Sequence, residues 1–361
     1  MFVYVLLFSF IIIMCKLQNY SYVFINRIKP IKGDKLYIYS VAGILILFMG
    51  LRATNVGCDV IQYFNRYKNA NVMYNLGITY SEWGFNYISY FFHDYLKLDF
   101  QFFLLFIAIV CIVSLSVCIY KYSDDILLSF ILYLTIGNFA LNMSGLRQTI
   151  AISLSLFAIV MAEKRKPILF YLLIFVASII HNSALIFMPV YFLWGKTINR
   201  KYAFILLIIA VSAFFYRQLL NPIITYLSPE RYSKYSLIEG YSINCLVILV
   251  PIIFCIYSLL FLNTDEDGKF DKKNSFFYCF SCISIFMMIL SLNNGQLGRL
   301  AYYFSIGNLI TVSAAMKSHK QYDRKIATII EIIMIVLCLL YFFISTPGGT
   351  LRIDRYMFFW Q

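Results

Sequence analysis

Long apolar segments alternate with short polar breaks along the whole chain. Within residues 142–183, two apolar segments flank the basic turn 163–167, which reads EKRKP. This pattern predicts an antiparallel pair of membrane helices. At a rise of about 1.5 Å per residue, the chain climbs roughly 24 Å from Arg147 to the turn and returns roughly 21 Å to His181. Arg147 and His181 are therefore expected at similar depth, at one face of the membrane.

Lysine and arginine collect in the breaks that would share the side of this basic turn. Because cytoplasmic loops of membrane proteins carry an excess of these residues, the turn is assigned to the cytoplasm and Arg147 and His181 to the outer face. The basic loops assigned inside are residues 16–35, 163–167, 195–201, 263–274 and 317–325, and the long loops assigned outside are residues 52–99 and 217–241.

The pattern predicts one polytopic domain over residues 1–361, with about twelve spans (ten to twelve) and both termini outside. The segment 1–15 is short for a span, and 183–194 contains Pro189 and is barely long enough. The better-defined spans are predicted at residues 36–51, 100–119, 126–141, 147–163, 167–181 and 326–345.

Composition supports an all-α integral membrane protein. Of 361 residues, 61% are hydrophobic and 13% are charged, and the mean hydropathy is +0.78; a soluble domain carries about twice that charged fraction. The net charge of +13 follows the loops, so it is interpreted as a topology signal and an attraction to anionic membrane lipid, with no nucleic-acid partner expected.

Seven of the nine cysteines lie in apolar segments, where cysteine behaves as a small hydrophobic residue, and Cys58 lies in an outer loop. This distribution argues against a disulfide framework. No cluster has metal-ligand spacing, and neither a phosphate-binding glycine loop nor a serine nucleophile elbow is present in the sequence. We expect no cofactor, and any catalysis would rest on positioning, acid–base chemistry and charge stabilisation.

Three arginines, Arg52, Arg147 and Arg299, stand at the predicted outer ends of spans. An arginine there is either an interfacial anchor or a phosphate ligand. The first turn of a helix attracts anions, which favours the second interpretation for Arg147, and Ser144 is expected to cap that helix. Three guanidinium groups could each donate paired hydrogen bonds to one dianionic or trianionic group.

Several other polar or aromatic residues near these arginines have two interpretations each. His181 is either a general base or a hydrogen-bonded residue at a helix end. Asp59 and Glu82 supply carboxylates that could be solvated, paired with arginine or catalytic. Trp83 and the loop tyrosines could stack on sugar rings, although such residues also gather at any membrane interface.

The order of short motifs along the chain resembles the EpsG-type, Wzy-like polysaccharide polymerases. These motifs are Gly50-Leu51-Arg52, Gly57-x-Asp59-x-x-x-Tyr63, Glu82-x-Gly84-Phe85, Leu146-Arg147-Gln148, His181-Asn182-Ser183, Gly298-Arg299, Tyr302-Tyr303-Phe304 and the closing Tyr356-Met357-Phe358-Phe359-Trp360. Cys58 before Asp59, and Trp83 where a proline is frequent, depart from the family's pattern at variable positions.

The resemblance implies a multi-pass enzyme of the bacterial cytoplasmic membrane, similar to C-type membrane glycosyltransferases. It would join oligosaccharide repeat units carried on undecaprenyl pyrophosphate at the outer face, with a chain-length regulator protein as a candidate partner. On this hypothesis arginines hold the donor pyrophosphate and a base activates the acceptor hydroxyl. The expected catalytic residues are Arg147, His181, Arg299, Asp59 and Glu82, and the expected substrate contacts are Arg52, Gln148, Tyr63, Trp83 and Tyr303.

Two other functions stay open at this point. A flippase for lipid-linked oligosaccharides would need polar groups along a passage open in turn to both faces, whereas the unusual charges here gather at one face. A membrane O-acyltransferase acting on surface sugars would use His181 as its base and would require an acyl donor.

Overall fold

The computed structural model describes residues 1–25, 33–77, 82–227, 245–292, 295–349 and 351–361. These residues form helices and loops, with no strand among them. The chain divides into two compact units, unit 1 (Met1–Tyr122, Ile126–Tyr191 and Met334–Gln361) and unit 2 (Ser123–Asp125 and Phe192–Ile333). Much of the second predicted outer loop lies outside the described residues.

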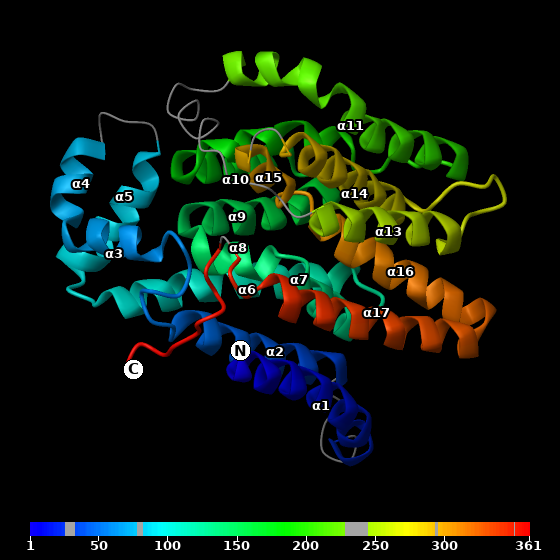
Figure 1. Ribbon diagram of the computed structural model, residues 1–361, viewed down its shortest axis with the longest axis horizontal. Coiled ribbons are helices and arrows are strands. Elements are labelled where there is room, and N and C mark those ends of the chain that lie inside the picture. The colour runs from blue at the N-terminus through cyan, green and yellow to red at the C-terminus, as the bar shows by residue number, and fades with distance from the viewer. Residues whose placement is uncertain (26–32, 78–81, 228–244, 293–294, 350) are drawn as a thin grey trace. The chain divides into compact units, whose positions relative to one another are not determined.

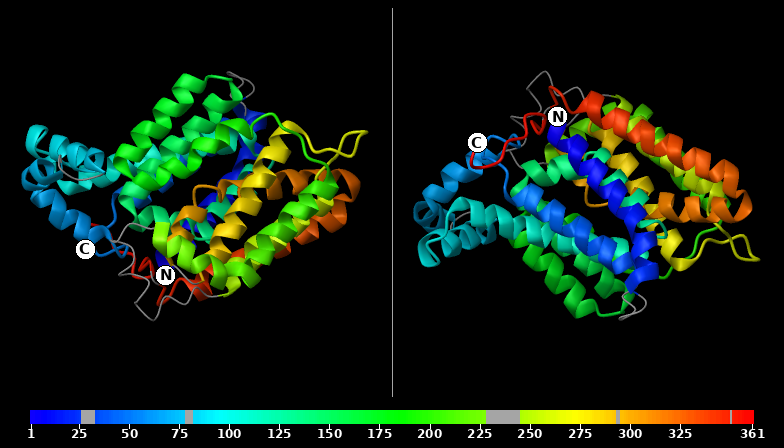
Figure 2. Two further views of the ribbon diagram at one scale, coloured as in Figure 1. Left: turned by 90° about the horizontal axis from the view of Figure 1, so that it is seen from above. Right: turned by 90° about the horizontal axis from the view of Figure 1, so that it is seen from below.

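The helices of unit 1 follow the apolar segments of the sequence (Figure 1). They are α1 (Phe2–Ile25), α2 (Gly33–Gly50), α3 (Val60–Lys68), α4 (Ala70–Gly77), α5 (Trp83–Tyr90), a π-helix (Phe91–Tyr95), α6 (Phe100–Tyr122), α7 (Ile126–Thr135), α8 (Asn138–Ser144), α9 (Leu146–Glu163), α10 (Pro167–Ile180) and most of a 3₁₀ helix (Asn182–Phe192). In Figure 2, α1 and α2 run side by side.

Unit 2 contains α11 (Arg200–Leu227), α13 (Cys245–Phe261), α14 (Lys272–Leu290), α15 (Gly295–Ala301) and α16 (Ile306–Tyr322). The last helix, α17 (Arg324–Ser345), begins in unit 2 and ends in unit 1. Within unit 2, Asp124 pairs with Lys273 at 2.6 Å and with Lys317 at 2.9 Å. These ion pairs join the break at Asp124 to two basic loops, 263–274 and 317–325, that the sequence assigns to the cytoplasmic side.

Among the described residues, five helices are long and apolar enough to cross a membrane: Phe100–Tyr122, Leu146–Glu163, Arg200–Leu219, Lys272–Leu290 and Arg324–Ser345. The pair α7 and α8, bent by 56°, could form a sixth span. Shorter apolar helices cover Phe2–Cys15, Pro167–Ile180, Asn182–Phe192 and Ile248–Phe261. The helices support a membrane protein, and the count of twelve spans stays a prediction.

Three predicted segments take a different local form. The loop 52–99 is largely helical, because it contains α3, α4, α5 and the π-helix. The predicted span 126–141 breaks at Gly137, whose φ of +93° cannot continue a right-handed helix. The segment after His181 is a 3₁₀ helix that includes Pro189, which has no backbone N–H to donate.

The predicted hairpin is confirmed as α9 and α10, which pack against each other around the turn 164–166 (Figure 1). Pro167 occupies the first turn of α10, where its missing N–H leaves no partner unsatisfied. One side of α10 is buried through Phe170 and Ile174, while Ile168 (82% exposed) and Leu172 (52% exposed) point outward. The outward side is apolar and includes Phe175 (59% exposed), as a lipid-facing surface should be.

An apolar cluster under α3 and α5 fixes the loop helices to α6, α9 and α10. It includes Tyr63, Phe85, Phe103, Leu146 and Ile180. Gly84 allows α5 to approach α10 closely, because a Cβ at this position would lie 2.7 Å from Cγ2 of Ile179. This contact places Glu82, directly before α5, beside the end of α10.

Candidate functional site

Glu82 is the centre of a charged cluster in unit 1. Its Oε2 accepts a hydrogen bond from Nη1 of Arg147 at 2.8 Å, and its Oε1 lies 2.8 Å from Nδ1 of His181. The backbone N–H of Asn182 donates to the same Oε1 at 3.1 Å. The Glu82 side chain is 6% exposed. Arg147 and His181, predicted at similar depth, are thus brought together through a carboxylate from a third segment.

Each of the three side chains comes from the end of a helix. Arg147 lies in the first turn of α9, and His181 follows the last residue of α10 in an extended conformation. Glu82 precedes α5 with φ of +71°. A left-handed backbone costs a residue with a side chain roughly 1–2 kcal/mol. Strained residues of this kind cluster at functional sites, where surrounding contacts hold them in place.

The charges around Glu82 determine its protonation. Burial raises the pKa of this carboxyl group, but the hydrogen bond from His181, the charges of His181 and Arg147, and the Asn182 N–H together lower the pKa below its ordinary value of 4.5. Glu82 is thus ionised at neutral pH and can only accept hydrogen bonds. Nδ1 of His181 must then donate, which leaves the lone pair of a neutral imidazole on Nε2.

Tyr63 contacts the side chain of Arg147. Nε of Arg147 lies 3.4 Å from the Tyr63 hydroxyl, and its guanidinium carbon lies 5.7 Å from the centre of the ring. Tyr63 is 7% exposed and packs against Phe85 at 5.3 Å between ring centres. Arg147 keeps 25% of its side chain exposed. In this structure Tyr63 orients the guanidinium, and its expected contact with substrate stays a prediction.

Arg52 differs from the expectation for a donor ligand. Its side chain is buried, and the residue is 1% exposed. The guanidinium donates to the carbonyl oxygens of Met49 and Met143, the latter at 2.9 Å, and the backbone bridges to Phe358 near the C-terminus. Since Met143 lies just before α9, Arg52 holds the segment that leads to Arg147. These contacts favour a positioning role over direct binding of pyrophosphate.

Ser144 does not cap α9, contrary to expectation. The capping position is Gly145, and no side chain caps it. The Ser144 hydroxyl instead accepts a hydrogen bond from the backbone N–H of Asp59 at 3.3 Å and lies 2.9 Å from Sγ of Cys58. Gly57, with φ of +100°, permits this crossing, because a Cβ there would lie 2.6 Å from the Met143 carbonyl oxygen. The segment 57–59 is thereby fixed against the start of α9.

The other predicted residues divide between the two units. Gln148 is buried in α9 at 3% exposure, and Trp83 is 46% exposed beside Glu82. Arg299 lies in α15 of unit 2, so its predicted convergence with Arg147 stays a prediction. Tyr303, also in unit 2, is 0% exposed, which argues against the expected contact with substrate. The described residues contain no cluster of three or more potential metal ligands.

The sequence indicated the three side chains of the cluster but not their arrangement. Glu82 and His181 are 99 positions apart, and no local pattern pairs them. The N–H of Asn182 and the contacts of Ser144 with Cys58 and Asp59 were not anticipated either. Two glycines in the sequence could have indicated that backbone segments approach each other closely at the site. Each lies two positions from a carboxylate, Gly57 from Asp59 and Gly84 from Glu82.

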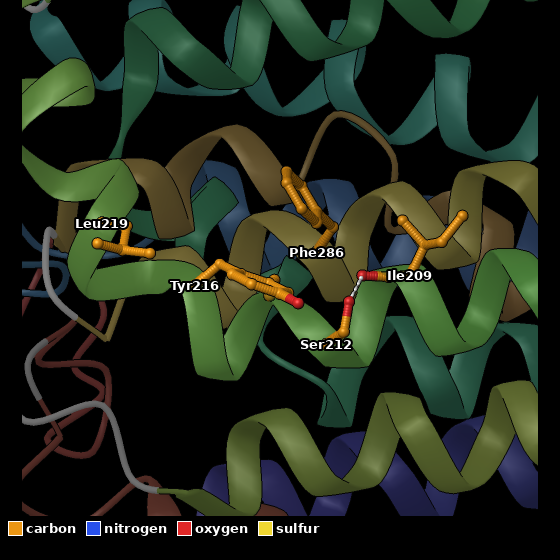
Figure 3. A pocket seen from close by; sticks show the side chains of 6 residues that line it. Ile209, Ser212, Tyr216, Leu219 and Phe286 are labelled. Carbon is orange, nitrogen blue, oxygen red and sulfur yellow. Dashed lines mark hydrogen bonds between the residues drawn. The ribbon is translucent and has the colours of Figure 1, made fainter.

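A pocket of about 410 Å³ lies elsewhere, in unit 2. It is lined by Ile209, Ser212, Ala213, Tyr216 and Leu219 of α11 and by Phe286 of α14 (Figure 3). The Ser212 hydroxyl donates to the Ile209 carbonyl oxygen at 2.9 Å. The pocket is almost wholly apolar and carries none of the charged groups described above.

Apolar helices long enough to span a bilayer, together with a buried ionic cluster at helix ends, define the class as a multi-pass helical membrane protein. The model of the EpsG family matches residues 35–358, and the chain therefore belongs to this family. Membership supports a role of the polysaccharide-polymerase type. No curated protein and no solved structure matches the chain.

Proposed function

We propose that this protein joins oligosaccharide repeat units, carried on undecaprenyl pyrophosphate, into a surface polysaccharide at the outer face of the bacterial cytoplasmic membrane. The observation that carries the proposal is the cluster of Glu82, Arg147 and His181. It combines a cation suited to a phosphate with a base whose orientation is fixed by an ionised carboxylate.

In the proposed reaction, a hydroxyl oxygen of the incoming unit attacks the anomeric carbon of the growing chain. The bond between that carbon and the pyrophosphate oxygen breaks, and lipid pyrophosphate leaves with the electron pair. The proton of the hydroxyl passes to Nε2 of His181, whose Nδ1 stays hydrogen-bonded to Glu82. Glu82 fixes the tautomer and stabilises the imidazolium that forms.

Arg147 carries the electrostatic part of the proposal. Negative charge grows on the pyrophosphate as the anomeric bond breaks, and a guanidinium can hold two of its oxygens in a fork. Arg147 is partly exposed and is oriented by Glu82 and Tyr63, so little reorganisation is required when the donor binds. We include Arg299 as a second cation on the donor and Asp59 as a group that orients the acceptor.

The test uses the purified protein in lipid nanodiscs with isolated lipid-linked repeat units, and products are followed by mass. Arg147→Ala should lower the rate of polymer formation by about 10²–10³-fold, as expected when one stabilising donor is removed from a developing charge. Arg165→Ala, at the exposed turn of the same hairpin, is the matched control and should polymerise normally. Wild-type chain growth by the Arg147→Ala protein would refute the assignment.

The same assay separates the other functions. Products that grow by whole repeat units indicate a polymerase, and products that grow by single acyl groups indicate an O-acyltransferase. Translocation of a labelled lipid carrier without any new product indicates a flippase.

A further inference from the structure

One exposed side of α5 and the following π-helix carries a row of aromatic side chains at intervals of four residues. The row comprises Trp83, Tyr87, Phe91 and Tyr95, which are 46%, 48%, 38% and 73% exposed, respectively. The opposite side of α5 is buried through Gly84, Phe85 and Ser89. We refer to the four exposed residues as the aromatic stripe.

The rings of the stripe are held by neighbouring contacts. Phe91 and Tyr95 lie parallel, with 5.3 Å between ring centres and 16° between planes. The π-helical turn supports this arrangement through a hydrogen bond from the Leu96 N–H to the Phe91 carbonyl oxygen at 2.9 Å. From α4, Tyr74 lies 6.0 Å from Tyr87. Because these contacts already restrict rotation of the side chains, the rings lose little further conformational entropy when a ligand binds to them.

The stripe differs from the exposed side of α17. The exposed side chains of α17 are aliphatic, as in Ile329, Ile333 and Leu340, whereas α10 and α11 also expose aromatic rings, among them Phe175 and Phe215. A helix that lies on an anionic membrane normally carries lysine or arginine on its polar side. Residues 82–96 contain neither. The absence of these cations, together with the polar edges of Trp83, Tyr87 and Tyr95, favours a ligand with both apolar faces and hydroxyl edges over the membrane surface.

Oligosaccharides have this chemistry. The C–H faces of a sugar ring pack on the apolar face of an aromatic ring, while the sugar hydroxyls stay hydrated or bond to the polar edges of tyrosine and tryptophan. The stripe begins at Trp83, directly after Glu82 of the candidate site, and the twelve steps from Trp83 to Tyr95 correspond to about 18 Å of helix. That length accommodates several sugar rings in succession.

We propose that the aromatic stripe binds the oligosaccharide chain that is being extended, along a path that starts at Glu82. This proposal rests on the proposed function, and it adds a binding surface to the catalytic cluster. By retaining the product between successive transfers, the stripe would increase the length of the polysaccharide.

The experiment measures binding of lipid-free oligosaccharide to the full-length protein in nanodiscs by calorimetry. The probe is a set of fragments of one to six repeat units, obtained by partial hydrolysis of the producing strain's own polysaccharide. Tyr87→Ala and Phe91→Ala should each weaken binding by about 3- to 10-fold, since an aromatic contact contributes about 0.5–1.5 kcal/mol. The control is Tyr202→Ala, which removes a tyrosine that is 60% exposed on α11.

A double variant, Tyr87→Ala/Tyr95→Ala, should still carry out a single transfer but make shorter polymer. Arg147→Ala should bind the fragments normally and fail to polymerise. Wild-type fragment affinity and chain length in the double variant would overturn the stripe proposal and leave the proposed function intact. If the double variant loses membrane abundance with unchanged fragment affinity, the stripe is an interfacial anchor and the proposal is likewise overturned.

The proposed function fails by a different result, namely normal polymerisation by the Arg147→Ala protein. In that case, weaker fragment binding by the stripe variants would still identify a glycan-binding surface.

Discussion

Replacing Glu82 with glutamine tests the central feature of the site with little change in shape. The amide retains one oxygen acceptor but presents an NH₂ group in place of the second oxygen. If the NH₂ faces Arg147, it meets another donor and the contact with Nη1 at 2.8 Å is lost. If it faces His181, both the His181 and the Asn182 contacts are disturbed.

The loss of one hydrogen bond to a charged group is worth about 1.5–3 kcal/mol, which corresponds to a decrease in rate of roughly 10- to 200-fold. The decrease should be larger if the amide donates to Nδ1 of His181, because the imidazole proton then moves to Nε2 and the base is lost. Both outcomes lower the turnover rate more than they lower the affinity for lipid-linked donor.

The assay is single-turnover extension of lipid-linked repeat units in nanodiscs, with protein abundance matched. The control is Glu163→Gln, which alters a carboxylate at the other end of α9 that interacts with Lys121 and Tyr122. Its rate should stay close to that of the wild type, because Glu163 lies at the opposite end of α9 and its partly exposed ion pair contributes little to stability. If the Glu82→Gln protein extends the chain at the wild-type rate at pH 7, Glu82 does not orient the reacting groups.

Three further predictions concern the surroundings of the cluster. Arg52→Ala removes the hydrogen bond to the Met143 carbonyl and should lower the free energy of unfolding in detergent by about 1–3 kcal/mol. Arg52→Lys should recover part of this loss. Gly84→Ala places a methyl group 2.7 Å from Ile179; this overpacking should cost about 1–3 kcal/mol and reduce activity, whereas unchanged melting would contradict the close packing of α5 on α10. Because the pKa of Glu82 is lowered below 4.5, its contribution to stability is complete above that pH and is lost as the pH falls through the lower folded-state value. Melting curves at pH 3 and pH 7 should therefore differ more for the wild type than for Glu82→Gln.

The sequence by itself determined several of the helices closely, although α1 continues to Ile25, into the loop predicted at 16–35. Spans predicted at residues 147–163 and 167–181 are observed as Leu146–Glu163 and Pro167–Ile180, and that predicted at 326–345 is observed as Arg324–Ser345. Helix formation depends on neighbouring residues, through backbone hydrogen bonds and the apolar character of each segment. For the same reason, the helix rise alone predicted that Arg147 and His181 lie at the same end of the hairpin.

The tertiary structure decided which groups meet. It joined Glu82 to Arg147 and His181, enclosed Arg52 between backbone carbonyls, and turned Ser144 toward Asp59 instead of the end of α9. These contacts link segments far apart in the chain, so no local periodicity encodes them. They depend on how closely backbones approach, and at Gly57 and Gly84 that approach is possible because a side chain is missing.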